Sequence, residues 1–176
     1  MKTLILLTIA LQLSLCVADA QPKTVAPNWA AWQFMQGKWV GEGSSELGAG
    51  SGYFTFEPDL QNKAWIRRNT AEYPATKDRP KYTHEDVMVV YFDQDVQQTR
   101  AFYYDTEGHV IHYTATWSID GRTVTLLGDA APNSPRYRLT YVEGAPGHMS
   151  VTLEMAQPGK PEEFRQIVEG KVRKVP

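Results

Sequence analysis

Short segments of alternating apolar and polar residues run through most of the chain, and turn residues separate them. This alternation is typical of strands that bury one face, and tight turns between such strands favour antiparallel pairing. The clearest turn is Asp120-Gly121, a dipeptide that favours a type I′ hairpin turn because both residues tolerate positive φ. We predict strands over residues 38–46, 52–57, 63–73, 86–92, 97–105, 109–119, 122–128, 135–143, 147–156 and 163–173.

About ten strands joined mainly by short turns predict an all-β protein, an antiparallel up-and-down β-barrel. A Greek-key sandwich is the alternative, but it needs long crossover connections, and only residues 74–85 and 128–135 form longer loops. Closing the sheet into a barrel also removes exposed strand edges. Residues 28–35 can form a short helix with Trp29 and Trp32 on one face. We expect this helix to close one end of the barrel.

The first twenty residues have the pattern of a secretory signal peptide. Lys2 precedes an apolar run, and residues 18–20 (Ala-Asp-Ala) match the small-x-small motif of a cleavage site. The run is too short for a membrane span of about 20 apolar residues. We therefore expect a secreted or periplasmic protein without an integral membrane segment, and lipidation of Cys16 is the alternative. The expected boundaries are residues 1–20 for the signal peptide, 21–27 for an extended lead-in and 28–176 for one barrel domain.

Cysteine content and charge limit the kinds of site and partner. Cys16 is the only cysteine, so a chain cleaved after residue 20 has no disulfide and no thiolate metal ligand. Its core must supply the stability, and a chain of about 155 residues is long enough to bury one. The formal net charge is −2 and no basic run occurs, which argues against a nucleic-acid partner. The oligomeric state is left open.

Several segments together carry a family resemblance. Gly37-Lys38-Trp39 matches a G-x-W barrel entry, and residues 39–43, 54–60, 67–74 and 107–113 extend the likeness. They resemble small exported calycin-like proteins of a largely uncharacterised bacterial group, related to lipocalins, fatty-acid-binding proteins and nitrobindin-like barrels. The resemblance implies a ten-stranded barrel around a ligand cavity, sealed at one end by a Trp.

The same resemblance bears on a cofactor. Nitrobindin-like barrels bind haem iron through a histidine in their last strands, and this chain has no histidine after His148. We therefore predict no cofactor, with haem as the alternative.

Candidate ligand contacts come from strands that carry polar residues on both faces. Arg67 and Arg68 are adjacent on a strand, so one of them must point inward, where a guanidinium can bind a carboxylate or phosphate. A salt bridge to Glu72, Glu85 or Asp86 is the alternative for that arginine. The candidate ligand-binding residues are Arg67, Arg68, His112, Tyr104, Tyr113, Trp65 and Trp117.

Three histidines are candidates for chemistry. His109 and His112 are three residues apart, which places them on opposite faces of a strand and does not favour a shared metal ion. His112 is the candidate for an acid–base or haem-binding group, and an exposed or structurally bonded histidine is the alternative. His84, Glu85 and Asp86 lie where the long loop 74–85 enters the predicted strand 86–92, a position expected at a mouth of the barrel. No second ligand cluster is visible near them, so we predict no metal site.

No serine-nucleophile, phosphate-loop or zinc-protease motif occurs, and the sequence identifies no catalytic residue. The favoured function is binding of a small, partly hydrophobic ligand in the barrel cavity, acidic if an arginine binds its head group. One alternative is an enzyme that uses His112 for acid–base isomerisation or haem chemistry. Another is an assembly module whose loop 74–85 contacts a partner.

Overall fold

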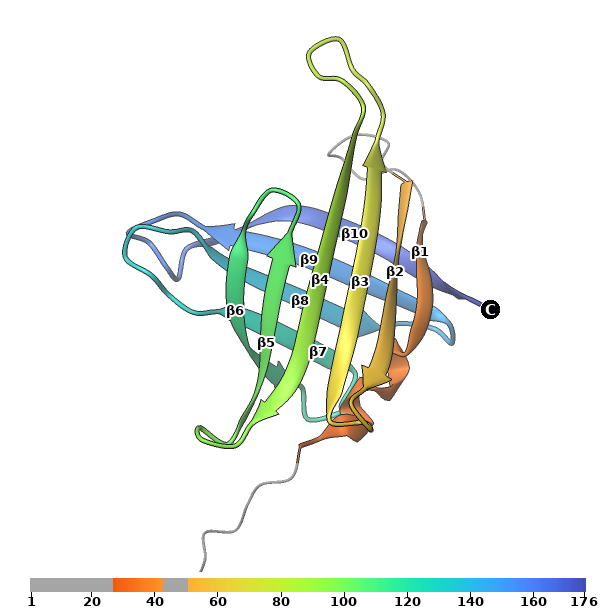
Figure 1. Ribbon diagram of the computed structural model, residues 1–176, viewed down its shortest axis with the longest axis vertical. Coiled ribbons are helices and arrows are strands. Elements are labelled where there is room, and N and C mark those ends of the chain that lie inside the picture. The colour runs from red at the N-terminus through yellow and green to blue at the C-terminus, as the bar shows by residue number, and fades with distance from the viewer. Residues whose placement is uncertain (1–26, 43–50) are drawn as a thin grey trace, which may run out of the picture.

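The computed structural model describes residues 27–42 and 51–176. These residues form a short 3-10 helix, η1 (Trp29–Met35), followed by a closed antiparallel β-barrel of ten strands (Figure 1). Each strand pairs with its neighbours in sequence, and β1 pairs with β10 to close the ring. The strands are β1 (Gly37–Glu42), β2 (Ser51–Asp59), β3 (Ala64–Tyr73), β4 (Tyr82–Asp93), β5 (Gln98–Asp105), β6 (Val110–Trp117), β7 (Thr123–Gly128), β8 (Arg136–Glu143), β9 (His148–Ala156) and β10 (Phe164–Val175). The predicted all-β up-and-down barrel is confirmed.

Part of the sequence prediction concerns residues that the structure does not describe. The predicted signal peptide, Cys16 and residues 21–26 of the predicted lead-in lie outside the described residues, as do residues 43–46 of the first predicted strand. Among the residues that are described, no helix is long and apolar enough to cross a membrane.

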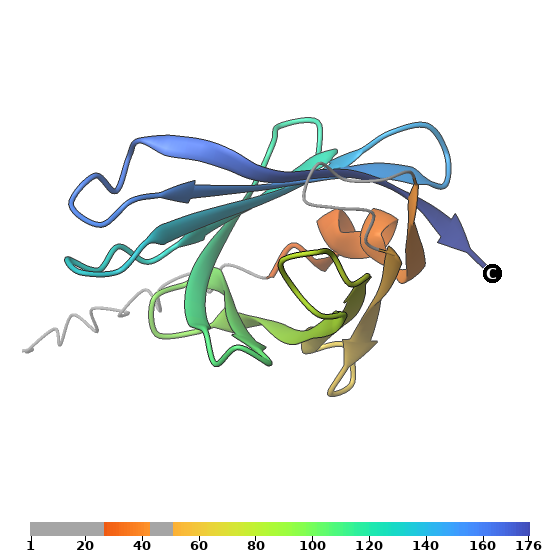
Figure 2. The ribbon, with the colours of Figure 1, turned by 90° about the horizontal axis from the view of Figure 1, so that it is seen from above.

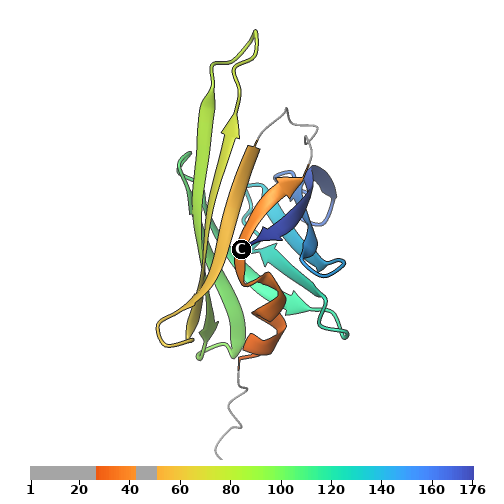
Figure 3. The same cartoon turned by 90° about the vertical axis from the view of Figure 1, so that its right-hand side faces the viewer.

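The β3–β4 hairpin is longer than the sequence predicted. β4 begins at Tyr82 and not at residue 86, because pairing with β3 continues as far as Tyr73 opposite Tyr82. The two tyrosine rings stack with their centroids 4.7 Å apart, which supports the end of the ladder. As a result, this hairpin projects beyond the other strands at one end of the barrel (Figures 1 and 3).

The turn between β6 and β7 differs from the predicted type I′ turn. Gly121 has a positive φ of 70°, but Asp120 does not have a positive φ, and type I′ requires positive φ at both positions. The Asp120 carboxylate instead accepts the backbone N–H of Arg122 at 3.1 Å. A side-chain bond of this kind is a common way for aspartate to stabilise a turn.

Helix η1 plugs the barrel end opposite the projecting hairpin. A 3-10 helix has three residues per turn, so Trp29, Trp32 and Met35 lie on one face. Trp32 and Met35 are completely buried. The Trp32 ring packs against Phe56 with centroids 5.6 Å apart and meets Trp117 edge-on at 5.8 Å. Figure 2 shows η1 inside the outline of the strands.

Trp39, on β1, connects helix η1 to the first strand through a hydrogen bond. Its indole N–H donates a buried hydrogen bond to the Met35 carbonyl, 2.7 Å long, and its ring stacks on Phe54. The chain can turn sharply between the two because Gly37 adopts a φ of 106°, which favours glycine. The predicted closure of one barrel end by the helix is therefore confirmed.

Candidate functional site

A cavity of about 420 Å³ occupies the half of the barrel that η1 does not fill. Its lining residues come from β1 to β6, from β8 to β10 and, with His109, from the connection between β5 and β6. Side chains of a strand point alternately to the two faces of the sheet, so most of these strands contribute every second residue, whereas β2 contributes residues 51–54 in succession. The volume falls in the range of about 300–1,000 Å³ that is usual for small-molecule sites.

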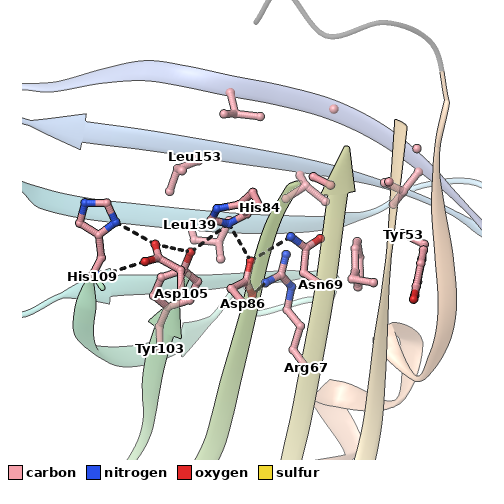
Figure 4. A pocket seen from close by; sticks show the side chains of 18 of the residues that line it. Tyr53, Arg67, Asn69, His84, Asp86, Tyr103, Asp105, His109, Leu139 and Leu153 are labelled. Atoms are coloured by element: carbon pink, nitrogen blue, oxygen red, sulfur yellow. Dashed lines mark hydrogen bonds and ion pairs between the residues drawn. The ribbon is translucent and has the colours of Figure 1, made fainter. Parts of the chain in front are cut away.

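The cavity has two chemically different walls (Figure 4). The polar wall belongs to β3, β4 and β5, and the apolar wall to β6, β8, β9 and β10. On the polar wall lie Arg67, Asn69, His84, Asp86, Tyr103 and Asp105. On the apolar wall lie Ile111, Leu139, Val151, Leu153, Val168 and Val172.

A buried ion pair forms the base of the polar wall. The antiparallel register of β3 and β4 places Asn69 opposite Asp86 and Arg67 two residues further along the same face. The Arg67 Nη1 donates to Asp86 Oδ1, and the two side chains are only 10% and 3% exposed. Asn69 Nδ2 donates to the other carboxylate oxygen at 2.9 Å. The salt bridge that the sequence left open for the inward arginine is therefore made to Asp86.

Interactions with neighbouring groups stabilise the charged form of Arg67 although its side chain is buried. Burial by itself lowers the pKa of Arg67, but its interactions with Tyr141, Asp86 and the tyrosines around the cavity raise that pKa above the ordinary value. Among the residues that the structure describes, the buried Nε has no hydrogen-bond partner. The charge of Arg67 is thus compensated by Asp86, and one of its N–H groups makes no hydrogen bond to these residues.

His84 links the ion pair to the rim of the cavity. Its Nε2 lies 3.2 Å from Asp86 Oδ2, and its Nδ1 lies 2.7 Å from Glu107 Oε2. The bond to Asp86, followed by the interactions with Glu107, raises the pKa of His84 above its ordinary value, because both carboxylates favour the charged imidazolium. The imidazole therefore bridges two acidic groups, and its contacts with both favour the protonated form.

Asp105 organises the other side of the rim. Its Oδ2 accepts the Tyr103 hydroxyl at 3.1 Å and lies 2.8 Å from His109 Nδ1. Its Oδ1 accepts the backbone N–H groups of Glu107 and His109. Burial alone would raise the pKa of Asp105, but the bonds from His109 lower it below the ordinary value. Burial also raises the pKa of Tyr103 strongly, so its phenol remains protonated and donates.

Four of the seven sequence-predicted site residues face the barrel interior. Arg67 and Tyr113 line the cavity. Trp65 is 1% exposed and packs against Phe56, and Trp117 packs against Trp32. Both tryptophans thus belong to the plugged end, below the cavity.

The other three predicted residues lie on the outer surface. Arg68 and His112 are exposed, as is Tyr104. The His112 ring packs against Phe102 on the outside of the sheet, with centroids 5.5 Å apart. His109, in contrast, lines the cavity, so His109 and His112 lie on opposite sides of the barrel wall, as their spacing predicts.

Sequence reasoning missed most of the polar wall, including His84 as a cavity residue. The signal was present, since His84 shares the period-two face of Asp86 and Met88, but the strand was predicted to start too late. Asp105 and Glu107 were missed because they are distant from His84 in the chain; Glu107 is 23 residues away. Barrel pairing of β4 with β5 brings them together.

The same residues include the donors that could hold a metal ion. One donor atom from each of His84, Asp105 and Glu107 lies within 4.8 Å of the other two. The fold therefore supplies the second ligand cluster that the sequence did not reveal. An imidazole with two carboxylates suits a divalent transition metal, although hydrogen bonds within the cluster already satisfy these groups.

The raised pKa of His84 predicts a pH-dependent stability. Because the pKa of His84 is higher in the folded than in the unfolded state, its protonation stabilises the fold. This contribution is fully present below the ordinary histidine pKa of about 6.5. This stability is lost as the pH rises through the folded-state pKa. Replacing His84 with Gln should therefore lower the thermal midpoint most below about pH 6.5, with a smaller difference at higher pH. Thermal unfolding of both proteins over a pH series measures this, and equal pH dependence of the two would contradict it.

Comparison of the chain with protein-family models and with curated proteins found no match. The closed ten-stranded antiparallel barrel is compatible with a calycin-like fold. One fold hosts many functions, so the function must be argued from the cavity itself.

Proposed function

We propose that this protein binds a small, partly hydrophobic molecule in the barrel cavity. The observation that carries the proposal is the amphipathic lining, in which an apolar wall faces a wall of hydrogen-bonding and charged groups. A concave, largely apolar site with a few convergent polar groups is the usual form of a small-molecule site. The polar wall would orient the ligand, and the apolar wall would supply most of the affinity.

The apolar part of the ligand would lie against β8, β9 and β10. Leu139, Val151 and Leu153 present aliphatic side chains to the cavity, and each buried CH₂ of a ligand contributes about 0.8 kcal/mol before the cost of association. Entry would be at the end opposite η1, beside the projecting β3–β4 hairpin, because the other end is plugged (Figures 1 and 3).

The signal-peptide pattern and the resemblance to exported calycin-like barrels support ligand binding outside the cytoplasm. The alternative of cavity chemistry was based on His112, and that ring lies outside the barrel. An acid–base or haem-binding role for His112 in the cavity therefore has no geometric support. Binding of a small molecule is the function that the arrangement favours.

Blocking the cavity tests the proposal. The neutral probe N-phenyl-1-naphthylamine fluoresces strongly in apolar surroundings, and its emission should rise and saturate on titration with the wild-type protein. Replacing Val151, which lines the cavity, with Trp should weaken probe binding by about tenfold or more, because the larger side chain occupies the apolar wall. Fluorescence titration gives the dissociation constant of each protein.

The matched control is Val142→Trp, the same substitution at a residue on β8 that is 37% exposed. It should leave the affinity for the probe unchanged. Failure of the wild-type protein to bind the probe, or equal weakening by both substitutions, would refute cavity binding.

A further inference from the structure

Donor atoms from three side chains come together at the rim of the cavity. His84 lies on β4, Asp105 at the end of β5 and Glu107 in the turn that follows. One donor atom from each lies within 4.8 Å of the other two. His84 and Asp105 also line the cavity (Figure 4), and the side chains of His84 and Glu107 are 22% and 38% exposed. An ion from solvent can therefore reach this cluster.

His84 is held in position from inside the barrel. Its Nε2 lies 3.2 Å from Asp86 Oδ2, and the Asp86 carboxylate is itself bound by Arg67 and Asn69. Metal-binding histidines usually bond to a carboxylate, a carbonyl or water through the ring nitrogen that does not bind the metal. The other nitrogen of His84, Nδ1, lies 2.7 Å from Glu107 Oε2, so an ion bound by this carboxylate would also meet the imidazole.

We propose that His84, Asp105 and Glu107 bind a divalent transition-metal ion such as Zn²⁺ at the rim of the cavity. The ion takes an imidazole nitrogen from His84 and a carboxylate oxygen from each acidic residue. Three protein ligands leave at least one coordination position for water. The inference goes beyond the proposed function and does not depend on it.

The donor set favours such an ion over calcium or magnesium. Calcium takes about six to eight oxygen ligands, and magnesium is bound mainly through carboxylates, phosphates and water. The cluster instead offers an imidazole nitrogen among its three donors, and imidazole suits zinc, copper, iron and nickel.

The charges of the cluster also match a divalent cation. Asp86 is already paired with Arg67. The cluster itself has the negative charges of Asp105 and Glu107, which a divalent ion would balance when His84 binds it as a neutral imidazole.

Binding requires existing hydrogen bonds to open and the donors to move closer together. Around a tetrahedral ion with bonds of about 2.0–2.2 Å, donor atoms lie about 3.3–3.6 Å apart, so the cluster must contract by roughly 1 Å. Glu107 lies in an exposed turn and can make this movement. Asp105 Oδ2 contacts His109 Nδ1 at 2.8 Å, and because His109 is exposed, its ring can turn away and free a lone pair of that oxygen.

Titration of metal-free protein with Zn²⁺ tests the site. The protein, purified without a histidine tag and treated with a chelator, is titrated by calorimetry at mildly alkaline pH, where protons compete less for the imidazole. We expect saturable binding of one ion per chain. Zn²⁺ should also raise the thermal midpoint, because an ion that binds the folded state stabilises it. Co²⁺ should bind at the same place and give the strong visible absorption of four-coordinate cobalt.

Substitutions identify the ligands. Glu107→Gln and His84→Gln should each weaken Zn²⁺ binding by at least about tenfold, since even residues behind the ligands contribute that much. Both should also reduce or shift the cobalt absorption. The matched controls are Glu85→Gln and His112→Gln, the same changes on the exposed face, and they should leave the affinity unchanged. Thermal unfolding without metal establishes that each variant is folded.

Each outcome supports or overturns the inference. Absence of saturable Zn²⁺ binding to the wild-type protein, equal weakening by Glu107→Gln and Glu85→Gln, or a cobalt spectrum that His84→Gln leaves unchanged would overturn it. Glu107→Gln decides the matter even if His84→Gln does not fold, because Glu107 is exposed. Binding of N-phenyl-1-naphthylamine tests the cavity separately, so failure of the metal site leaves the proposed function intact.

Discussion

Replacing Arg67 with methionine should lower the free energy of unfolding by about 3–5 kcal/mol, the usual effect of removing one partner of a buried ion pair. The physical reason is that the Asp86 side chain, only 3% exposed, would keep its charge without the guanidinium. Asn69 and His84 would still contact that carboxylate, but they would not replace the ion pair with the Arg67 guanidinium. Urea unfolding followed by tryptophan fluorescence measures the change.

Two further variants show whether the cost comes from the uncompensated charge. Arg67→Met combined with Asp86→Leu removes both charges and should recover much of the loss, because apolar replacements of buried pairs are often tolerated. Arg68→Met, one residue away on the exposed face, should change stability by no more than about 0.5 kcal/mol. Similar costs for Arg67→Met and Arg68→Met would show that the ion pair contributes no stability.

Replacing Trp32 with alanine should also cost about 3–5 kcal/mol, as is usual for a completely buried tryptophan. This side chain fills the plugged end between Phe56 and Trp117, and a rigid barrel cannot collapse to fill the space that it leaves. The same chemical denaturation measurement applies.

Trp32→Phe is the conservative control for this position. Phenylalanine retains most of the apolar volume, and it removes an indole N–H that is buried without a hydrogen-bond partner in residues 27–42 and 51–176. We therefore expect a much smaller loss than for alanine. If Trp32→Ala cost less than about 1 kcal/mol, η1 would not be a structural plug.

The two ends of the barrel interior differ in how completely side chains fill them. At the η1 end, tryptophans and other large apolar side chains fill the interior. Towards the mouth, polar groups and smaller aliphatic side chains leave a cavity open. The sequence showed this contrast only indirectly, as strands such as residues 63–73 with polar residues on both faces. The structure shows that one of those faces lines the cavity.

Features that depend on local chain properties could be predicted from the sequence. The alternation of apolar and polar residues, with turn residues between the segments, predicted all ten strands. The short connections predicted their antiparallel pairing in a barrel. Both signals lie in residues that are close together in the sequence. The helix at residues 28–35 was also predictable from the spacing of its apolar residues. The start of β4 was not, because pairing with Tyr73 extends the strand beyond its own pattern.

The composition of the site was decided by tertiary structure. Because side chains alternate between the two faces of a strand, Arg67 and Arg68 must point in opposite directions. Only the closure of the barrel determines which of the two points inward. The same holds for His112, whose strand buries Tyr113 and exposes the histidine. His84 and Glu107 are in contact although they are 23 positions apart in the sequence. A pattern among neighbouring residues cannot predict a contact over such a separation. The sequence alone determined that the chain would form a barrel, whereas strand register decided which side chains the cavity presents to a ligand.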